Sequence, residues 1–500
     1  MASVDSTASG GSRAKKIGLW LLVLILVAAG AAAIYLLRRY PNDVPVTYED
    51  ATEHFLHGSI GGDTDNGLPR RVMEVLPEVF ADLLPAGAPH DWTAFGFQVD
   101  PGQVIPIGFS ERTMRVPLLG MNCALCHTGI VRASADAPPT RILGMGSTTL
   151  DLEGFFGFLF RVVADPRYTP EVLIPAMEKR APMDALDRFV YGKVIARFKA
   201  GLEGRKAMLG ALFAPDRPGF GPGRVDTFNP YKLSTLGQHY PDGLAPEEAI
   251  GNARYASIWA QATTKNRPLN WDGNAPRIED RNAGAAFGAG ATHDSIDMAQ
   301  IARIQAWLEV LPAPKWPYAA PDAEEVARGQ LVFKNRCFDC HDDAGKRIGE
   351  IIPIELIGTD RRRFDSYTPK LNQLFLDMGN GRPWDLTSMQ KMAGYANRPL
   401  DGLWARGPYL HNGSVPTIWD LLTPAAERNG GQPTFRVGHG VIDANNLGIQ
   451  ADVEAIDGRP TAVFDTRLAG NSNQGHTGPV YGTDLTDEDK KALIAYLKTL

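Results

Sequence analysis

Both cysteine pairs of this chain are followed by a histidine, and residues of these types at this spacing can do chemistry. The 500-residue chain has four cysteines. All four lie in two CxxCH motifs, Cys123, Cys126 and His127 in the first and Cys337, Cys340 and His341 in the second. Two thiols at this spacing can bind zinc, form a redox dithiol, or attach a haem through two thioether bonds with the histidine on the iron.

The alternatives to haem leave part of this pattern unexplained. A four-cysteine zinc site would join two distant pairs and give neither histidine a role. A thioredoxin-like dithiol would need a βαβ pattern, which the sequence lacks. Structural disulfides suit an exported protein, but a bond across two residues is strained and bonds between the pairs again ignore the histidines. We therefore predict two covalently bound c-type haems, with His127 and His341 as iron ligands.

The first residues of the chain indicate export. Residues 17–37 form an uncharged apolar run of the length that crosses a bilayer as a helix. Three basic residues precede the run and favour a cytoplasmic tail at residues 1–16, although two arginines beyond it weaken the asymmetry. The small residues AAGAAA suit a cleavage site, so a transmembrane signal anchor and a cleaved signal peptide both remain open. In either case we expect the body in the periplasm, held at the inner membrane if the span is kept.

Composition narrows the class of protein further. The chain is 44% hydrophobic and 22% charged, which is typical of a globular protein rather than a disordered one. A formal net charge of -6 provides no basic surface for nucleic acid, so no nucleic-acid partner is expected.

The elements that must position the motifs are predicted to be helices. Helical periodicity recurs along the chain and strand-like alternation is scarce, which predicts a mainly α fold of two cytochrome c-like haem domains with long loops. A Pro-rich hinge at residues 311–323 separates an N-terminal haem domain, residues 40–310, from a C-terminal cytochrome c domain, residues 324–500. In the second domain one helix runs into the CxxCH motif, and another, capped by Thr486, ends the chain.

Longer motifs carry a family resemblance. With LNWDGNAPRIEDRN and GPYLHNGSVPTIWDLL in the expected order, most of residues 100–500 resembles the bacterial di-haem cytochrome c peroxidase superfamily. Within it, VIPIGFSER, GMNCALCHTG, LWARGPYLHNGSVPTIWDLL and GNSNQGH are most similar to the branch that contains the rubber oxygenases. The resemblance implies that chemistry occurs at the haem on His127 and that the haem on His341 relays electrons. It also implies a calcium ion between the domains, held largely by backbone carbonyls.

The resemblance gives Trp271 a role, but the sequence lacks a catalytic acid that the peroxidases of the family have. Trp271 matches the tryptophan between the two haems of the family, whereas taken alone it is equally a large core aromatic. The peroxidases carry a catalytic glutamate about twenty residues after the WDG motif, where it moves a proton during peroxide cleavage. Here Ala291 lies near that place, and Glu279 and Asp280 come too early.

The segment that replaces the glutamate is apolar. Phe287 lies among glycine and alanine residues that let the backbone approach a flat group closely. An apolar pocket at the haem favours oxygen chemistry over acid–base cleavage of peroxide, and a tightly packed loop with Phe287 in the core explains the same residues. His293 is the nearby residue that can replace the missing base, with a structural role as the alternative.

The sixth ligand of the C-terminal iron is predicted to be a histidine. No methionine follows Met392, which leaves His411, His439 and His476 in the C-terminal segment. We prefer His476 because it matches the tail motif of the rubber-oxygenase branch. His411 is expected to contact a haem edge or propionate, as the matching residue does in the family.

These features together predict an exported di-haem c-type cytochrome oxidoreductase with peroxidase-like architecture and, as an option, oxygenase chemistry at the N-terminal haem. Its partners would be a small-molecule or hydrophobic substrate that the sequence does not name, a periplasmic electron donor or acceptor, and the membrane. The competing prediction is a periplasmic electron carrier, in which both irons have two protein ligands and no substrate site exists.

Overall fold

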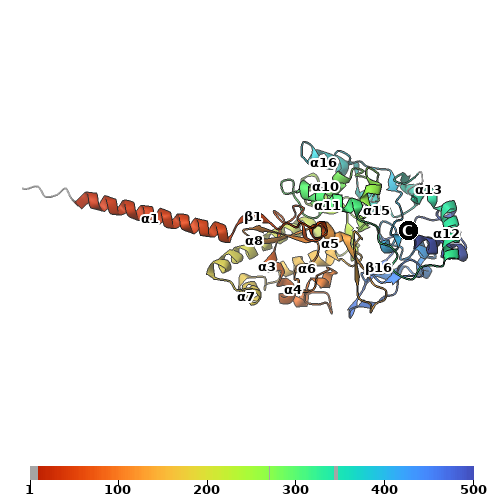
Figure 1. Ribbon diagram of the computed structural model, residues 1–500, viewed down its shortest axis with the longest axis horizontal. Coiled ribbons are helices and arrows are strands. Elements are labelled where there is room, and N and C mark those ends of the chain that lie inside the picture. The colour runs from red at the N-terminus through yellow and green to blue at the C-terminus, as the bar shows by residue number, and fades with distance from the viewer. Residues whose placement is uncertain (1–9, 270, 343–346) are drawn as a thin grey trace, which may run out of the picture.

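A single long helix stands apart from the body of the protein. The computed structural model describes residues 10–269, 271–342 and 347–500, and α1 (Gly10–Arg39) projects from the body as an isolated rod (Figure 1). Within α1, Lys15–Arg39 has a mean hydropathy of 2.7 and is long and apolar enough to cross a membrane. A signal sequence near an N-terminus meets the same criteria, so this helix agrees with both export alternatives.

The first CxxCH motif follows a small antiparallel sheet. The sheet has the order β1-β3-β4-β2 and consists of β1 (Asn42–Pro45), β2 (Leu68–Pro69), β3 (Phe109–Met114) and β4 (Val116–Met121). Strand β4 leads through Asn122 into α5 (Cys123–His127), and a hairpin of β5 (Thr128–Val131) and β6 (Thr140–Leu143) follows. The first motif is therefore held between strands rather than after a long helix.

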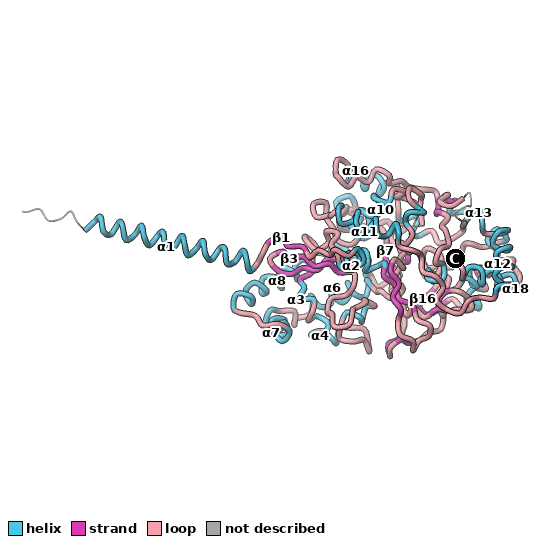
Figure 2. Tube along the Cα trace, viewed as in Figure 1, coloured by secondary structure: helices cyan, strands magenta, loops and turns pink. Residues whose placement is uncertain are grey.

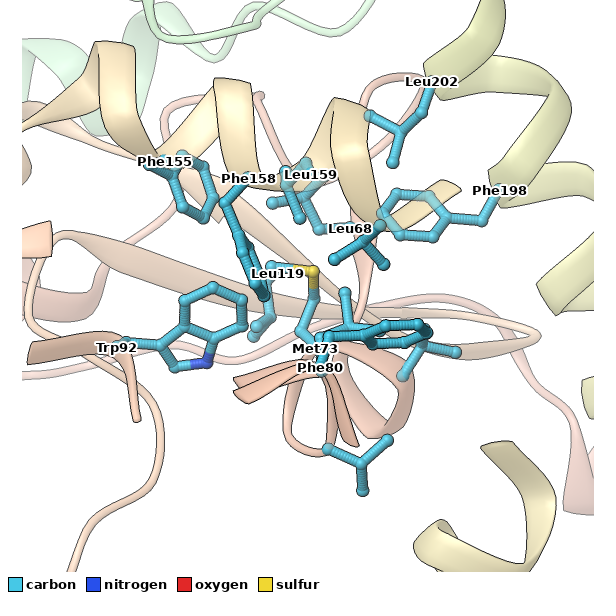
Figure 3. Close-up of a cluster of buried hydrophobic side chains, with 14 of the residues drawn as sticks. Leu68, Met73, Phe80, Trp92, Leu119, Phe155, Phe158, Leu159, Phe198 and Leu202 are labelled. Atoms are coloured by element: carbon cyan, nitrogen blue, oxygen red, sulfur yellow. The ribbon is translucent and has the colours of Figure 1, made fainter. Parts of the chain in front are cut away.

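The largest core of the protein lies under this sheet and is built around α6 (Leu152–Ala164). Phe155, Phe158, Leu159 and Val162 recur at helical spacing and are fully buried. Figure 3 shows the first three beside Trp92 and Met73, with side chains of α8 reaching in. Burying each such side chain contributes about 1.5–3 kcal/mol. The remaining helices of this part are α2 (Ala51–His57), α3 (Arg70–Met73), α4 (Leu76–Val79), α7 (Pro170–Arg180) and α8 (Ala185–Leu209).

The middle of the chain connects the two motifs. It contains the strand pair β7 (Arg224–Asp226) and β8 (Asn252–Arg254) with the helices α9 (Asn229–Leu233), α10 (Ile278–Gly288) and α11 (Met298–Val310). After α11 the Pro-rich segment is extended until α12 begins. The segment is packed against the body, because Trp404 Nε1 donates to the Pro314 carbonyl oxygen at 2.7 Å. The domain limits predicted around it stay a prediction.

Two crossed helices hold the second CxxCH motif. Helix α12 (Ala323–Arg336) packs on the terminal helix α18 (Asp487–Leu497), both at the right of Figure 1. At Gly329 a Cβ atom would lie 1.9 Å from the Ala492 carbonyl oxygen, so only glycine allows this approach. Helix α12 then leads into α13 (Phe338–His341). As predicted, one helix precedes the motif and another, capped by the Thr486 side chain, ends the chain.

Short elements and loops fill the rest of the C-terminal half. The helices are α14 (Ile354–Ile357), α15 (Arg362–Ser366), α16 (Pro369–Gly379) and α17 (Ile418–Leu421). The strands form four antiparallel pairs, β9 (Ile351–Pro353) with β10 (Gly394–Ala396), β11 (Thr434–Val437) with β16 (Ala462–Asp465), β12 (Ile442–Asp443) with β13 (Gly448–Ile449), and β14 (Ala455–Ile456) with β15 (Arg459–Pro460).

The prediction of a mainly α fold is wrong. The structure is 43% helical and 12% strand, with several small sheets and long loops throughout the body (Figure 2). Most of the strands have two to four residues, such as Ile442–Asp443 and Gly448–Ile449. An alternating pattern needs more residues than this to be recognised, which is why the sequence showed the helices and concealed the strands.

Candidate functional site

The first motif is fixed by the residue that precedes it. The Asn122 side chain is buried, and its oxygen accepts from the Ala124 amide at 3.0 Å and caps α5. Its amide nitrogen donates to the Gly58 carbonyl at 2.9 Å, just beyond α2. Asn122 thus ties the start of the Cys123–His127 turn to the end of a neighbouring helix.

His127 has the tautomer that a metal ligand needs. Its Nδ1 atom lies 2.8 Å from the carbonyl oxygen of Ala256, and a carbonyl can only accept, so Nδ1 carries the proton. The lone pair is therefore on Nε2, the atom available to a metal. Burial lowers the pKa of His127 to about 4, which keeps the ring neutral at physiological pH.

The second motif repeats this arrangement with another carbonyl. His341 Nδ1 lies 2.9 Å from the carbonyl oxygen of Arg398, so its Nε2 is also the free nitrogen. Burial lowers the pKa of this histidine as well. Two motifs with different local folds therefore present their histidines in the same way.

A second histidine faces His341. The ring centroids of His341 and His476 are 6.4 Å apart, with an interplanar angle of 40°. This separation leaves room for one metal atom with a bond of about 2 Å to each ring. Buried Arg428 holds the loop, because its guanidinium donates to the Gly475 carbonyl at 2.9 Å and to the His476 carbonyl at 3.2 Å. Burial, and then the nearby His341, lower the pKa of His476 to about 3, so this ring is also neutral.

The other two histidines of the C-terminal segment have different surroundings. Both nitrogens of His439 are engaged, Nε2 with the Arg436 carbonyl at 3.1 Å and Nδ1 with the Val441 amide at 3.0 Å, so it is structural. His411 is buried beside Tyr395, with ring centroids 5.0 Å apart. Its Nε2 has no hydrogen-bond partner among the described residues. An unpartnered buried nitrogen suits contact with a group that the protein itself does not provide.

Trp271 lies between the segments that contact the two motif histidines. Its ring is 4.8 Å from the guanidinium of Arg254, two residues before Ala256, and 5.7 Å from that of Arg398. The His411 ring is 6.4 Å away in an edge-on arrangement. The geometry agrees with the bridging position that the family resemblance implied, although the role itself stays a prediction.

Phe287 and His293 lie together, in an aromatic cluster. Phe287 is buried at the end of α10, with the Trp384 ring at 4.8 Å and the His293 ring at 5.9 Å. His293 Nε2 is buried with no partner among the described residues. The preceding Ala286 belongs to the same buried hydrophobic cluster as Ala124 of α5.

The partners of the motif histidines were missed by the sequence analysis. Ala256 is 129 residues from His127, and Arg398 is 57 residues from His341. Arg398 also donates from Nη2 to the Ser257 carbonyl at 3.3 Å, next to Ala256. A continuous series of contacts thus joins the two histidines, and no spacing in the sequence signals it.

The donor set fits haem better than the alternatives. Within the described ranges no three His, Cys, Asp or Glu side chains gather into a metal-binding group, and the four cysteines are unbridged. Burial raises the pKa of Cys123 to about 11 and that of Cys126 to about 12. Zinc binding and dithiol redox chemistry both use the thiolate. Each motif instead offers two thiols and one neutral histidine, which is the set that a c-type haem takes.

Part of the chain is similar to a known protein family. Residues 394–430, which include Arg398 and His411, match a family described as RoxA-like, cytochrome c-like. The match implies a covalent c-type haem and supports the rubber-oxygenase-like branch, and it does not extend to the wider peroxidase superfamily.

Two relatives from Sinorhizobium fredii (strain NBRC 101917 / NGR234) are similar over longer stretches. Uncharacterized protein y4iJ is 27% identical over 619 aligned positions, covering 97% of this chain and 100% of the relative. Uncharacterized protein y4iM is 28% identical over 291 positions, covering 49% of this chain and 63% of that protein. Neither name describes an activity, so these relatives support no reaction for this chain.

Proposed function

We propose that the protein is an exported di-haem c-type cytochrome that acts as an oxidoreductase, with chemistry at the first motif and electron relay at the second. The observation that carries the proposal is the unequal surroundings of the two motif histidines. His476 faces His341, whereas no histidine ring is in contact with His127 within the described part of the chain. An iron with one histidine ligand can take an exogenous ligand, and an iron between two histidines transfers electrons.

The residues of the chain would prepare these two roles. Haem at each motif would supply the one-electron chemistry. The carbonyls of Ala256 and Arg398 orient the two histidines and increase their basicity. Trp271 lies between the segments that carry these carbonyls.

The first test is the haem content of the full chain. Protein expressed with a working haem-attachment system is expected to carry two haems that survive denaturation, measured by intact mass and by the pyridine haemochrome spectrum. Variants Cys123→Ser/Cys126→Ser and Cys337→Ser/Cys340→Ser should each retain one. Wild-type protein without covalent haem would contradict the proposal.

The second test separates an enzyme from an electron carrier. If only the second motif has two protein ligands, the reduced protein should bind carbon monoxide at one of its two haems, seen in difference spectra. Binding at neither haem would favour the periplasmic electron carrier. A calcium ion between the domains, a small or hydrophobic substrate and a periplasmic electron donor or acceptor remain parts of the proposal.

A further inference from the structure

Between the two motif histidines lies a pocket that has more positive than negative charge. Three arginines and one carboxylate line it, Arg281, Arg398, Arg406 and Asp401. Serine, threonine and glutamine side chains complete the polar lining. The formal charge of the lining is therefore +2, three cations against one anion.

The three guanidiniums have no ion-pair partner in the described chain. No carboxylate oxygen of the described residues lies within 4.0 Å of any of them, Asp401 included. They contact carbonyls instead, as Arg406 Nη1 does with Pro399 at 2.6 Å and Arg281 Nη2 with Pro276 at 3.5 Å. The Nε atoms of Arg398 and Arg406 are buried without a hydrogen-bond partner. Burying a charge without a counter-charge is costly, so this arrangement points to an anion that the protein does not supply.

Buried arginines elsewhere in the protein differ in their compensation: Arg224 and Arg428 donate mainly to backbone carbonyls, whereas Arg132 and Arg363 have carboxylate partners. Arg132 is 7% exposed, the same fraction as Arg406, and pairs with Asp457 at 2.8 Å. Arg363 is also buried and faces Asp272 at 3.4 Å. Burial, and then the nearby Arg254, lower the pKa of Arg406 to about 10 despite Asp401, and the guanidinium remains charged at neutral pH.

The pocket lies beside the carbonyl partners of both motif histidines, and its arginines suit a carboxylate. Ser257 of the lining follows Ala256, the partner of His127, and the Arg398 carbonyl is the partner of His341. The planar fork of arginine matches a carboxylate in a bidentate way. A haem carries two propionate carboxylates, and the two negative charges equal the excess charge of the lining.

We infer that Arg281, Arg398 and Arg406 form a carboxylate-binding pocket that holds the propionates of a haem attached at one of the two motifs, an inference that rests on the proposed function. The pocket would raise the reduction potential of that haem, because nearby positive charge stabilises the reduced iron. Arg398 has its own carbonyl on His341 and donates from its side chain to the carbonyl of Ser257, next to the partner of His127, so one charged residue lies near both haem sites.

The experiment measures the potentials of both haems in the full chain. Arg406→Gln and, as the less integrated second variant, Arg281→Gln are expected to lower the equilibrium constant for reduction of one haem by about tenfold, which is 59 mV for a one-electron couple. Arg406→Lys keeps the charge and should restore most of this loss. Arg132→Gln removes an equally buried arginine that has its own carboxylate. It should leave the equilibrium constants for reduction of both haems within a few-fold of the wild-type values.

The outcomes separate this inference from the proposed function. Wild-type protein with two covalent haems and unchanged potentials in Arg406→Gln and Arg281→Gln would overturn the pocket alone, whereas absence of covalent haem would overturn both. Potentials of the wild type that change with added inorganic phosphate would indicate that the pocket takes a free anion, which also overturns the propionate assignment.

Discussion

Two histidines near the C-terminus differ in what their ring nitrogens contact. His439 uses both nitrogens within the protein, whereas the Nδ1 atom of His476 is buried without a partner among the described residues and its ring faces His341. A histidine whose nitrogens are both engaged cannot bind a metal without losing a hydrogen bond. The sequence had left both residues as candidates, and the contacts separate them.

Replacing His476 with alanine should therefore change the spin state of one haem. With one axial nitrogen removed, a low-spin signal from two histidines is expected to become high-spin in the optical and electron paramagnetic resonance spectra. His439→Ala is the matched control and should leave both signals unchanged while lowering stability. A low-spin spectrum that survives in His476→Ala would transfer the ligand to another residue.

The missing glutamate leads to a prediction about the oxidant. Peroxide cleavage without a positioned acid–base group should be slower by about a hundredfold or more. His293, held between Phe287 and Trp384, is the residue nearby that can substitute. We expect slow peroxide turnover in the wild type, and a gain in Phe287→Glu if this cluster lies at the reacting haem. Rapid wild-type turnover that persists in His293→Ala would contradict oxygenase chemistry.

The helices around the second motif depend on one close approach. Gly329 of α12 lies against the backbone of α18, and the Phe333 and Tyr496 rings, 5.2 Å apart, pack beside it. The sequence predicted both helices, the terminal one from its Thr486 cap and apolar stripe. It did not predict their crossing, because contact between segments this far apart in the chain leaves no local pattern.

Gly329→Ala should separate these helices and destabilise the C-terminal half by about 1–3 kcal/mol, because the added Cβ would overlap the Ala492 carbonyl. Gly201→Ala in α8 is the control, since a Cβ there meets nothing within 4 Å. Alanine is the better helix former, so the control should gain about 0.5–1 kcal/mol. Thermal unfolding followed by circular dichroism would measure both, and equal melting temperatures would contradict the crossing.

At the scale of the whole molecule, functional residues could be predicted where they lie in one short motif. They could not be predicted where folding brings distant segments together. Cys123, Cys126 and His127 lie within five consecutive positions, and so do their counterparts near residue 340. The carbonyl partners and the arginine pocket bring together residues from 256 to 406, which no spacing rule connects. The short strands were not predicted for a related reason, since their pairing is set by contacts between loops rather than by periodicity.

The contacts between the end of α1 and the body indicate which part of the body would lie at the membrane surface. Arg39, at the end of α1, contacts Asp184 at 2.7 Å and Asp187 at 2.8 Å, and both carboxylates lie at the start of α8. Phe189, on the next turn, is 64% exposed. If α1 spans the membrane, the start of α8 lies at its surface, where an exposed aromatic side chain is favourable.

A retained anchor predicts a specific fractionation. Wild-type protein should stay in the membrane pellet after carbonate extraction, and its intact mass should include residues 1–39. A variant with a cleavable signal peptide in place of these residues should appear in the soluble periplasmic fraction with the same haem spectrum, because the two motifs and their carbonyl partners lie within the body. Soluble wild-type protein whose chain begins at the small residues of positions 28–33 or directly after them would show instead that the apolar run is a signal peptide removed on export.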